Sequence, residues 1–394
     1  MKRKKNVLLI VETSRAFGRA LLQGISHHIL EHDDWSVHVE DRGLLEATPN
    51  WLKSWKGDGI ISRTSTFAIH RAISGRNIPI VELLGNGKGV VSEVRSNEDQ
   101  VAHEAFEHFA QSGFRDFGFF AIGNAWWSQL RQEAFQRKVN EHQGRLHFFP
   151  EAGTGHRVFY PVWEPKFDRL MQRWLRRLPK PIAVWAVSDT LAIRLLEGCR
   201  REKIRVPEDV AILGTTNDTL LCNTLSPPLS SIDLNGFEIG YTAAERLARK
   251  MRNESVEAVP VMISPIGVVA RQSTDVVALP DAEISAAVRL IRENATRNIS
   301  VDRIAEAVNI SRSTLQRRFR QMVGRTVEKE IMRTRMERAK RLLRETNFAL
   351  SSIAIKTGFA TNDYFVQAFR RECGITPNQY RKRLRRIDLA EDLS

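Results

Sequence analysis

The amino-acid sequence predicts an α/β region with two lobes of parallel sheet, followed by an all-α domain with two helix-turn-helix units. Over the first 275 residues, short apolar runs alternate with amphipathic stretches. This rhythm is typical of strands and helices that alternate in a parallel sheet. After residues 271–280, which we expect to form a connector, the pattern is wholly helical. One motif then occurs twice, in residues 299–324 and in residues 350–374.

Strands of the α/β region are expected where apolar runs are short and continuous, because a strand covered on both faces shows no alternation. We expect them at residues 7–11, 37–39, 59–61, 80–84, 117–122, 146–149, 182–187 and 210–213. Helices are expected where apolar residues recur every three or four positions. These positions are residues 17–30, 99–111, 129–141, 166–178 and 190–202.

The charge of the chain is concentrated in its helical part. The formal net charge is +14, with a pI near 10.0. From residue 281 onward there are 24 Lys and Arg against 14 Asp and Glu, so this part carries +10 of the total. A basic segment of this kind favours contacts with the phosphates of nucleic acid.

Several classes of protein are disfavoured by composition and motifs. The apolar run at residues 7–11 is too short for a signal peptide, and no apolar stretch approaches the ~20 residues of a membrane helix, so we expect a cytoplasmic protein. The three cysteines, Cys199, Cys222 and Cys373, form no CxxC pair. We therefore expect no metal site, no disulfide and no cofactor.

The first repeat, ISVDRIAEAVNISRSTLQRRFRQMVG, has the form of a short helix, a tight turn and a second helix. Ser311 is expected to cap the second helix, with Leu315, Phe319 and Met322 on its inward face. In the major groove arginine suits guanine and glutamine suits adenine. The side chains expected to reach DNA from the outward face are Ser313, Gln316, Arg317 and Arg320.

The second repeat, LSSIAIKTGFATNDYFVQAFRRECG, predicts a second unit of the same form. Thr361 is expected to cap its second helix, with Phe365, Ala368 and Phe369 facing inward. The residues expected to contact DNA are Asn362, Asp363, Tyr364 and Gln367. An apolar stripe predicts one long helix between the two units, formed by Val327, Ile331, Met336, Ala339, Leu342 and Leu343. The two reading helices could then enter successive major grooves, ~34 Å apart.

The repeats resemble the DNA-binding domain of the AraC/XylS family of transcription regulators. The matching residues lie in GFATNDYFVQAFRRECGITPNQYRKR, and they are Gly358, Phe359, Phe365, Phe369, Gly374, Thr376, Pro377, Tyr380 and Arg381. The resemblance covers residues 281–386 and implies double-stranded DNA as a partner. It also implies that the base-reading positions fall on the residues already named in each second helix.

The α/β region resembles the effector domain of LacI-type repressors and periplasmic sugar-binding proteins. The resemblance rests on VWAVSDTLAIRLLEGCRREKIRVPEDVAILG, on PPLSSIDLNGFEIGYTAAERL and on VARQST. It implies two Rossmann-like lobes that close on a small ligand. Ligands of open α/β sheets bind at the carboxyl ends of the strands.

This resemblance implies candidate ligand contacts, although each has a structural alternative. Asp189 matches the family's ligand-contacting acid but could instead cap the next helix, and Arg131 matches a ligand-contacting arginine. The other candidates are Ser14, Arg15, Trp126, Trp127 and Asn217. A Trp at such a position more often belongs to the core than to a ligand platform. Many family members carry Asp where this chain has Thr216, which leaves the identity of the sugar open.

The order of the two domains is informative, because LacI-type proteins carry their helix-turn-helix at the N-terminus. The fusion found here resembles regulators of xylose operons. It implies D-xylose as the sugar effector, pentose-utilisation genes as targets, activation through RNA polymerase, and a homodimer. We expect the sensing domain at residues 1–275, a linker at 276–282, the DNA-binding domain at 283–386 and a tail at 387–394.

Three alternatives remain at this point. The regulator could respond to a different monosaccharide or small ligand, because spacing does not reveal the shape of a pocket. A sugar-binding transport component is disfavoured by the basic helical part. An enzyme is disfavoured because the sequence has no GxGxxG after its first strand and no GxxxxGK[ST], HExxH or GxSxG.

Overall fold

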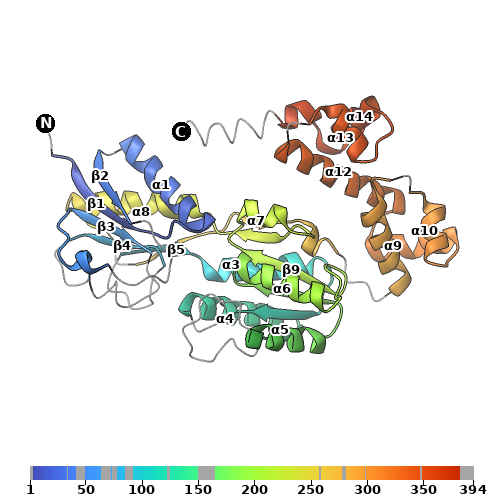
Figure 1. Ribbon diagram of the computed structural model, residues 1–394, viewed down its shortest axis with the longest axis horizontal. Helices are drawn as coiled ribbons and strands as arrows, with labels where there is room; N and C mark the ends of the chain where they lie inside the picture. The colour runs from blue at the N-terminus through green and yellow to red at the C-terminus, as the bar shows by residue number, and fades with distance from the viewer. Residues whose placement is uncertain are drawn as a thin grey trace. The chain divides into compact units, whose positions relative to one another are not determined.

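The computed structural model divides the chain into two units, Met1–Ala278 and Leu279–Ser394, coloured along the chain in Figure 1. The residues that the structure describes are 3–32, 34–40, 49–63, 72, 78–84, 92–121, 125–149, 165–256, 259–276, 281–297, 299–346 and 348–381. In this part of the chain no helix combines the length and the apolar character needed to cross a membrane.

The first unit consists of two lobes, each with a six-stranded sheet. In the first lobe the strand order is β11-β5-β4-β3-β1-β2, and all neighbouring strands are parallel. The strands are β1 (Lys5–Ile10), β2 (Trp35–Val39), β3 (Gly59–Ser62), β4 (Ile80–Glu82), β5 (Ser92–Ser96) and β11 (Val261–Ile263). Among the described residues its helices are α1 (Ala16–His32) and α8 (Gly236–Met251), with a 3-10 turn at Asn50–Lys53.

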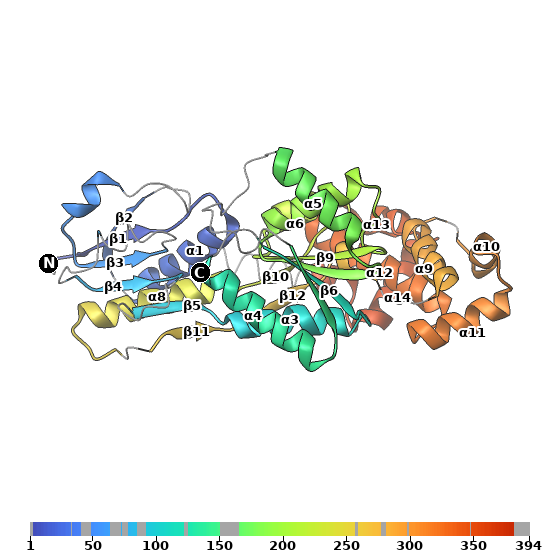
Figure 2. The same ribbon diagram turned by 90° about the horizontal axis from the view of Figure 1, so that it is seen from below.

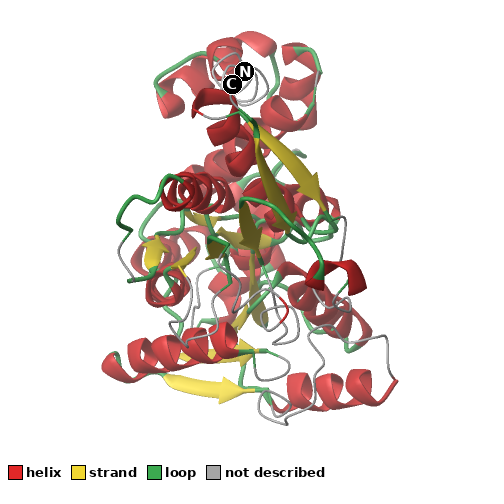
Figure 3. Ribbon diagram, turned by 90° about the vertical axis from the view of Figure 1, so that its left-hand side faces the viewer, coloured by secondary structure: helices red, strands yellow, loops and turns green. Residues whose placement is uncertain are grey.

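The second lobe has the strand order β12-β10-β9-β8-β6-β7, in which only β12 is antiparallel to its neighbour. Its strands are β6 (Asp116–Phe120), β7 (Arg145–Phe148), β8 (Ile182–Ala186), β9 (Val210–Thr215), β10 (Ser230–Asp233) and β12 (Gly267–Val269). Its helices are α3 (Glu98–Ala110), α4 (Trp126–Glu141), α5 (Pro165–Arg177), α6 (Asp189–Arg201) and α7 (Thr219–Thr224). Figure 3 shows strands as yellow arrows with red helices beside them.

The chain passes between the lobes three times, after β5, after β10 and after β11. The sequence thus builds most of the first lobe, then most of the second, and returns to the first with α8 and β11. Each sheet is therefore completed by a late segment of the chain, and neither lobe can form from one continuous stretch. The two lobes are linked through several short crossings, which suits two bodies that move about a common hinge.

The core of the first lobe explains why its strands are apolar throughout. Along β1, Val7 and Leu9 pack in a cluster with residues of α1 and α8, whereas Leu8 and Ile10 belong to a second cluster on the other side of the strand. Side chains alternate between the two faces of a strand, so a strand buried on both faces needs a continuous apolar run. All four side chains are at most 3% exposed.

Helices α1 and α8 lie side by side against this sheet, as Figure 2 shows. Two glycines permit their close approach. A Cβ atom added to Gly24 would lie 2.0 Å from the carbonyl oxygen of Phe237, and one added to Gly240 would lie 2.0 Å from that of Leu21. Any larger residue at these positions would push the two helices apart.

The predicted fold class is confirmed, and every predicted strand and helix of the α/β region overlaps an observed one. Elements that the sequence analysis did not name are β5, β10, β11, β12, α7 and α8. The expected connector at residues 271–280 begins too early. Arg271 donates hydrogen bonds to Asn223 and to the carbonyl oxygen of Leu229, and Ser273 and Thr274 are buried. These residues therefore belong to the second lobe.

The regular elements described in the second unit are all helices, joined by short turns. Its helices are α9 (Ala282–Asn294), α10 (Val301–Ala307), α11 (Arg312–Val323), α12 (Val327–Glu345), α13 (Leu350–Lys356) and α14 (Asn362–Cys373). Helices α10 and α11 form the first helix-turn-helix, α13 and α14 form the second, and α12 joins them. The predicted apolar stripe of α12 is largely buried, with Val327, Met336, Ala339 and Leu343 at most 2% exposed.

The first helix of this unit is fixed to the first helix-turn-helix. Asp281 caps α9, because its carboxylate accepts a hydrogen bond from the backbone N–H of Ile284 at 3.1 Å. The same carboxylate accepts a hydrogen bond from Nε of Arg318, on α11, at 2.8 Å. The start of α9 and the reading helix α11 are thus held together by a capping residue and a guanidinium.

Candidate functional site

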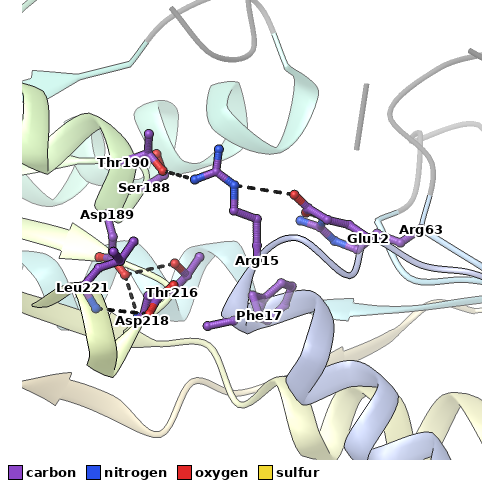
Figure 4. Close-up of a pocket in the computed structure, with 11 residues that line it drawn as sticks. Glu12, Arg15, Phe17, Arg63, Ser188, Asp189, Thr190, Thr216, Asp218 and Leu221 are labelled. Atoms are coloured by element: carbon purple, nitrogen blue, oxygen red, sulfur yellow. Dashed lines mark hydrogen bonds and ion pairs between the residues drawn. The ribbon is translucent and has the colours of Figure 1, made fainter. Parts of the chain in front are cut away.

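A pocket lies between the two lobes of the first unit, at the carboxyl ends of their strands (Figure 4). This is where open α/β sheets bind ligands. Most of its lining is charged or polar. The lining residues are Glu12, Arg15, Ala16, Phe17, Arg63, Ser188, Asp189, Thr190, Thr216, Asp218 and Leu221.

Asp189 is the buried centre of the side formed by the second lobe. It is 2% exposed, and its carboxylate accepts hydrogen bonds from the hydroxyls of Ser231 and Thr216 and, at 2.8 Å, from the backbone N–H of Asp218. Burial raises the pKa of Asp189 to about 6, although these hydrogen bonds act in the opposite direction. The capping alternative is wrong, because Ser188 is the N-cap of α6 and accepts from the N–H of Leu191.

The loop after β9 is held in an unusual backbone conformation beside Asp189. Thr216 has a φ of +104°, which is rare for a β-branched residue. Its N–H donates to the carbonyl oxygen of Ile232 at 2.9 Å, and its hydroxyl donates to Asp189 at 3.1 Å. Such strained positions cluster at ligand sites, where the surrounding structure holds them.

On the side of the first lobe, Glu12 organises the pocket. Glu12 follows β1 and is 3% exposed; it forms an ion pair with Arg63 at 2.6 Å and accepts a hydrogen bond from the hydroxyl of Ser14 at 3.1 Å. Arg15 lies 3.7 Å from Glu12 and donates a hydrogen bond across the pocket to the hydroxyl of Thr190, in the first turn of α6. The pocket is thus bridged directly between the lobes by Arg15.

Of the seven predicted ligand contacts, the structure brings Arg15 and Asp189 together around the pocket. Arg131 is 3% exposed, forms an ion pair with Glu98 and donates to the carbonyl oxygen of Val187 at 3.1 Å. Trp127 lies under the guanidinium of Arg131, and Trp126 lies under that of Arg95. In this structure these three predicted contacts make protein contacts and do not line the pocket.

The other two predicted contacts are also engaged with the protein. Ser14 is exposed and donates to Glu12. Asn217 donates to Asp233 at 3.1 Å and accepts from Arg271 at 3.0 Å. Neither is among the residues that line the pocket.

Sequence reasoning did not name Glu12, Arg63, Thr190 and Asp218 as pocket residues. Each lies just after a strand or in the first turn of the helix that follows it. The signal that could have found them is position alone, because polar residues at the carboxyl ends of neighbouring parallel strands meet at one edge of the sheet.

In the second unit, the reading helix of the first helix-turn-helix is built as predicted. Ser311 accepts from the N–H of Thr314, and Leu315 and Phe319 are fully buried. Met322 is only half-buried, and Val323 takes the last inward position. The predicted DNA contacts Ser313, Arg317 and Arg320 are exposed, whereas Gln316 is half-buried and donates to Glu328 at 3.2 Å.

The second reading helix repeats this construction. Thr361 accepts from the N–H of Tyr364, and Phe365, Ala368 and Phe369 are at most 1% exposed. The predicted DNA contacts Asn362, Asp363, Tyr364 and Gln367 are all exposed. Both reading helices end at a glycine with a φ of +75°, Gly324 and Gly374, a conformation that suits glycine.

The described residues contain no group of three or more His, Cys, Asp or Glu side chains that could hold a metal ion. Cys199 and Cys222 are buried, and burial raises the pKa of the Cys199 thiol to about 12. These two thiols are therefore poor nucleophiles, because the thiolate is the reactive form.

Comparison with protein families gives the same two parts. Residues 106–274 match the model of a periplasmic binding protein-like domain. Residues 304–383 match that of a helix-turn-helix domain, and residues 284–323 match that of bacterial regulatory proteins of the tetR family. The chain thus joins a ligand-sensing α/β domain to a helix-turn-helix domain, which is the construction of a ligand-responsive DNA-binding transcription regulator.

Individual relatives show both parts in the same order. The xylose operon regulatory protein of Escherichia coli strain K12 is 27% identical over 388 residues, which cover 96% of this chain and 97% of that protein. That of Haemophilus influenzae is 27% identical over 385 residues, 95% and 97% of the two chains. The structure of the xylose-binding transcription activator XylR superposes with a TM-score of 0.76 at 26% identity, over 97% of this chain and 98% of that one.

The chain is similar to the xylose operon regulators over nearly its whole length. The α/β unit alone is shared more widely. A LacI family regulator from Enterococcus faecium with bound ribose has a TM-score of 0.56 at 20% identity, covering 70% of this chain and all of that one. At 20% identity, this structural similarity shows a shared fold alone.

Proposed function

We propose that this protein is a D-xylose-responsive activator of pentose-utilisation genes. The carrying observation is that one chain combines a polar pocket bridged between two lobes with two reading helices whose polar faces are exposed. The choice of D-xylose rests on the relatives whose names state xylose. Sensing is assigned to residues 1–275 and DNA binding to residues 283–386.

The chemistry of the pocket suits an uncharged ligand with many hydroxyl groups. Its lining holds the carboxylates of Glu12, Asp189 and Asp218 and the guanidinium groups of Arg15 and Arg63. Carboxylates accept hydrogen bonds and guanidinium groups donate them, so each sugar hydroxyl can find a partner of either kind. A neutral ligand adds no charge to this lining, in which Glu12 is already paired with Arg63 and Asp189 accepts hydrogen bonds from neutral groups.

Ligand binding is proposed to stabilise the arrangement in which the lobes approach one another. Arg15 and Thr190 already join the lobes across the pocket. A ligand that contacts both sides of the pocket binds more tightly when the lobes are close together than when they are apart. The population of the two arrangements can shift only by that difference in affinity.

DNA recognition is assigned to the exposed faces of α11 and α14. Arg317 and Arg320 in the first helix, and Asn362 and Gln367 in the second, have side chains that can read base edges in the major groove. Ser313, Gln316, Asp363 and Tyr364 complete the proposed contact set. The proposed ligand contacts beyond Arg15 and Asp189 are Ser14, Trp126, Trp127, Arg131 and Asn217, which would have to exchange protein partners for ligand.

We further infer a homodimer that works in the cytoplasm, contacts RNA polymerase and has no enzymatic activity. The last point is supported by its relatives, which are transcription regulators. A homodimer would let two copies read two half-sites, and sedimentation of the purified chain tests it. A regulator that responds to another monosaccharide is the second candidate, because the ribose-bound neighbour shares the α/β fold.

The test is a selection of duplexes from random-sequence DNA by the full-length protein, with and without D-xylose. We expect an enriched motif of two boxes about one helical turn apart, recovered in greater yield with D-xylose. D-ribose and L-arabinose serve as controls for the sugar. Recovery of no common motif would overturn the DNA-reading assignment, and a motif whose yield ignores D-xylose would overturn the effector.

A further inference from the structure

Arg335 lies in α12, the helix that joins the two helix-turn-helix units, and it contacts the end of α9, which packs against the first unit, and the turn of the second. Its Nε donates a hydrogen bond to the carbonyl oxygen of Ala295 at 2.6 Å. Its guanidinium also lies 5.8 Å from the centre of the Phe359 ring. One partly buried side chain therefore joins the end of α9 to the turn between α13 and α14.

On the side of the first helix-turn-helix, the contact is made at the C-terminal end of α9. Ala295 is the C-cap of this helix and is fully buried. The last carbonyl groups of a helix have no partner within it, and a cation there is favoured by the helix dipole. Helix α9 packs against α10 and α11. A contact that fixes Ala295, at the end of α9, therefore also helps to fix the position of the first reading helix, α11.

On the side of the second helix-turn-helix, the contact leads directly to the other reading helix, α14. Phe359 is 4% exposed, and its ring centre lies 5.3 Å from that of Phe365 and 5.9 Å from that of Tyr364, both on α14. The neighbouring Gly358 also touches the end of α9. A Cβ atom added there would lie 2.8 Å from Cα of Thr296, and its φ is +82°.

We propose that Arg335 is a positioning residue that fixes the separation and rotation of the two reading helices. The protein would then accept only operators whose two boxes have one spacing. The inference deepens the proposed function and rests on it, because it presumes that α11 and α14 read DNA. It assigns the spacing specificity to a side chain that need not touch DNA.

The physical reason is that α12 alone does not fix this geometry. Helices bend and twist along their length, so a brace away from the helix axis controls the angle between bodies at its two ends. Each added base pair turns the second box by about a tenth of a helical turn. Two joined modules keep their advantage over one only if both can bind at once.

The experiment uses the full-length protein and the duplex obtained from random-sequence selection. Variants of this duplex have one or two base pairs inserted between the boxes, or the second box scrambled. Arg335→Met keeps the apolar stem but removes the donors and the charge. Arg338→Met makes the same change in an exposed residue of the same helix and is the matched control.

For the unaltered protein and for Arg338→Met, we expect a one-base-pair insertion to lower affinity about tenfold, toward that for the scrambled duplex. For Arg335→Met we expect weaker binding to the parent duplex and an insertion penalty of about threefold or less. Its affinity for the scrambled duplex should stay within about twofold of the unaltered protein's. Gly358→Ala places a Cβ atom against Thr296 and so forces the end of α9 away from the turn between α13 and α14. We expect it to lower the insertion penalty as Arg335→Met does.

An unaltered insertion penalty in Arg335→Met would overturn the proposal, and so would a loss of binding to the scrambled duplex. A thermal unfolding curve of each variant shows whether it is folded. Should Arg335→Met unfold, Arg335→Lys, which keeps the charge but loses the planar guanidinium, must show an intermediate insertion penalty. If selection yields no motif for the unaltered protein, the proposed function has failed rather than the assignment of Arg335.

Discussion

Arg15 of the first lobe donates a hydrogen bond to the hydroxyl of Thr190 in the second lobe, so the two sides of the pocket are joined by one side chain. Thr190→Val keeps the shape of residue 190 but removes this acceptor. We expect affinity for D-xylose to fall about fivefold to tenfold, which corresponds to the ~1 kcal/mol of one hydrogen bond. Thr190→Ser keeps the hydroxyl and should bind nearly as the unaltered protein does. Calorimetric titration of the two variants separates these outcomes, and equal affinities would show that the bridge plays no part in closure.

Asp189 accepts three hydrogen bonds in a buried site, and its replacement should affect both folding and sensing. Asp189→Asn has the same shape but one acceptor oxygen fewer. We expect the free energy of unfolding to fall by about 1–3 kcal/mol, since a buried donor loses its partner. The response of DNA binding to D-xylose should be lost, while DNA binding itself remains. A normal sugar response in a folded Asp189→Asn variant would remove this residue from the ligand site.

The stability of the protein between pH 4 and pH 6 should contain two opposed contributions. Burial raises the pKa of Asp189 to about 6, above its ordinary value of 3.8, so its contribution is full below pH 3.8 and is lost as pH rises through 6. Burial lowers the pKa of His108 from 6.5 to about 4, so its contribution is full above pH 6.5 and is lost as pH falls through 4. Each corresponds to roughly 3 kcal/mol.

The measurement is the free energy of unfolding against pH for Asp189→Asn and His108→Gln. Relative to the unaltered protein, Asp189→Asn should lose stability more steeply as pH falls from 6 to 4, because only the histidine contribution remains. His108→Gln should lose it less steeply or gain stability. Parallel curves for all three proteins would contradict both assignments.

Glu330 is a fully buried carboxylate between Arg325 and Arg333, at the start of α12. Burial alone would raise its pKa, but the hydrogen bonds and charges of Arg333 and Arg325 outweigh burial and hold the pKa below the ordinary value. Glu330→Gln leaves two guanidinium groups without this carboxylate. We expect it to destabilise the second unit by about 3–5 kcal/mol.

A matched control lies on the same helix. Glu337 is exposed and pairs with Lys340 at 2.9 Å, so Glu337→Gln should change stability by less than about 1 kcal/mol. Circular dichroism at helical wavelengths follows unfolding of both units, and D-xylose titration shows whether the first unit is intact, so that a loss of signal with sugar binding retained is assigned to the second unit. Similar unfolding curves for the two variants would show that the buried Glu330 carboxylate stabilises the protein no more than the exposed Glu337 carboxylate does.

Arg317 is exposed on α11 and is assigned to base reading. Arg317→Ala should cost ~1–3 kcal/mol of specific binding and relax the preference at one base position. Arg371, at the exposed end of α14, serves as a control for loss of charge alone. Selection from random-sequence DNA gives the preference of each variant, and an unchanged motif would exclude Arg317 from the reading set.

The fold was predictable where packing leaves a local signature. Residues 7–11 form a continuous apolar run because both faces of β1 are covered, and the caps Ser311 and Thr361 mark the starts of two helices. Strand β5 has no such signature. Its sequence SEVRS is polar, yet Glu93 is 2% exposed and lies 3.5 Å from Arg95, so burial there depends on an ion pair formed only in the fold.

The ligand site was predictable only in part, for a related reason. Asp189 and Arg15 follow strands and match a family pattern, whereas Arg63 is distant from Glu12 in the sequence. The two meet because β1 and β3 are neighbours in the sheet. Arg131 has the expected spacing, but Glu98 lies beside it and forms its ion pair. Local spacing cannot show which partner a buried guanidinium finds.

The most direct test of the central claim is calorimetric titration of the full-length protein with D-xylose, beside L-arabinose, D-ribose and D-glucose. The account predicts selective binding of D-xylose that is weakened in Thr190→Val and lost in Asp189→Asn. Binding of another of these sugars in preference to D-xylose would contradict the effector assignment. Binding of none would contradict the assignment of the pocket between the lobes.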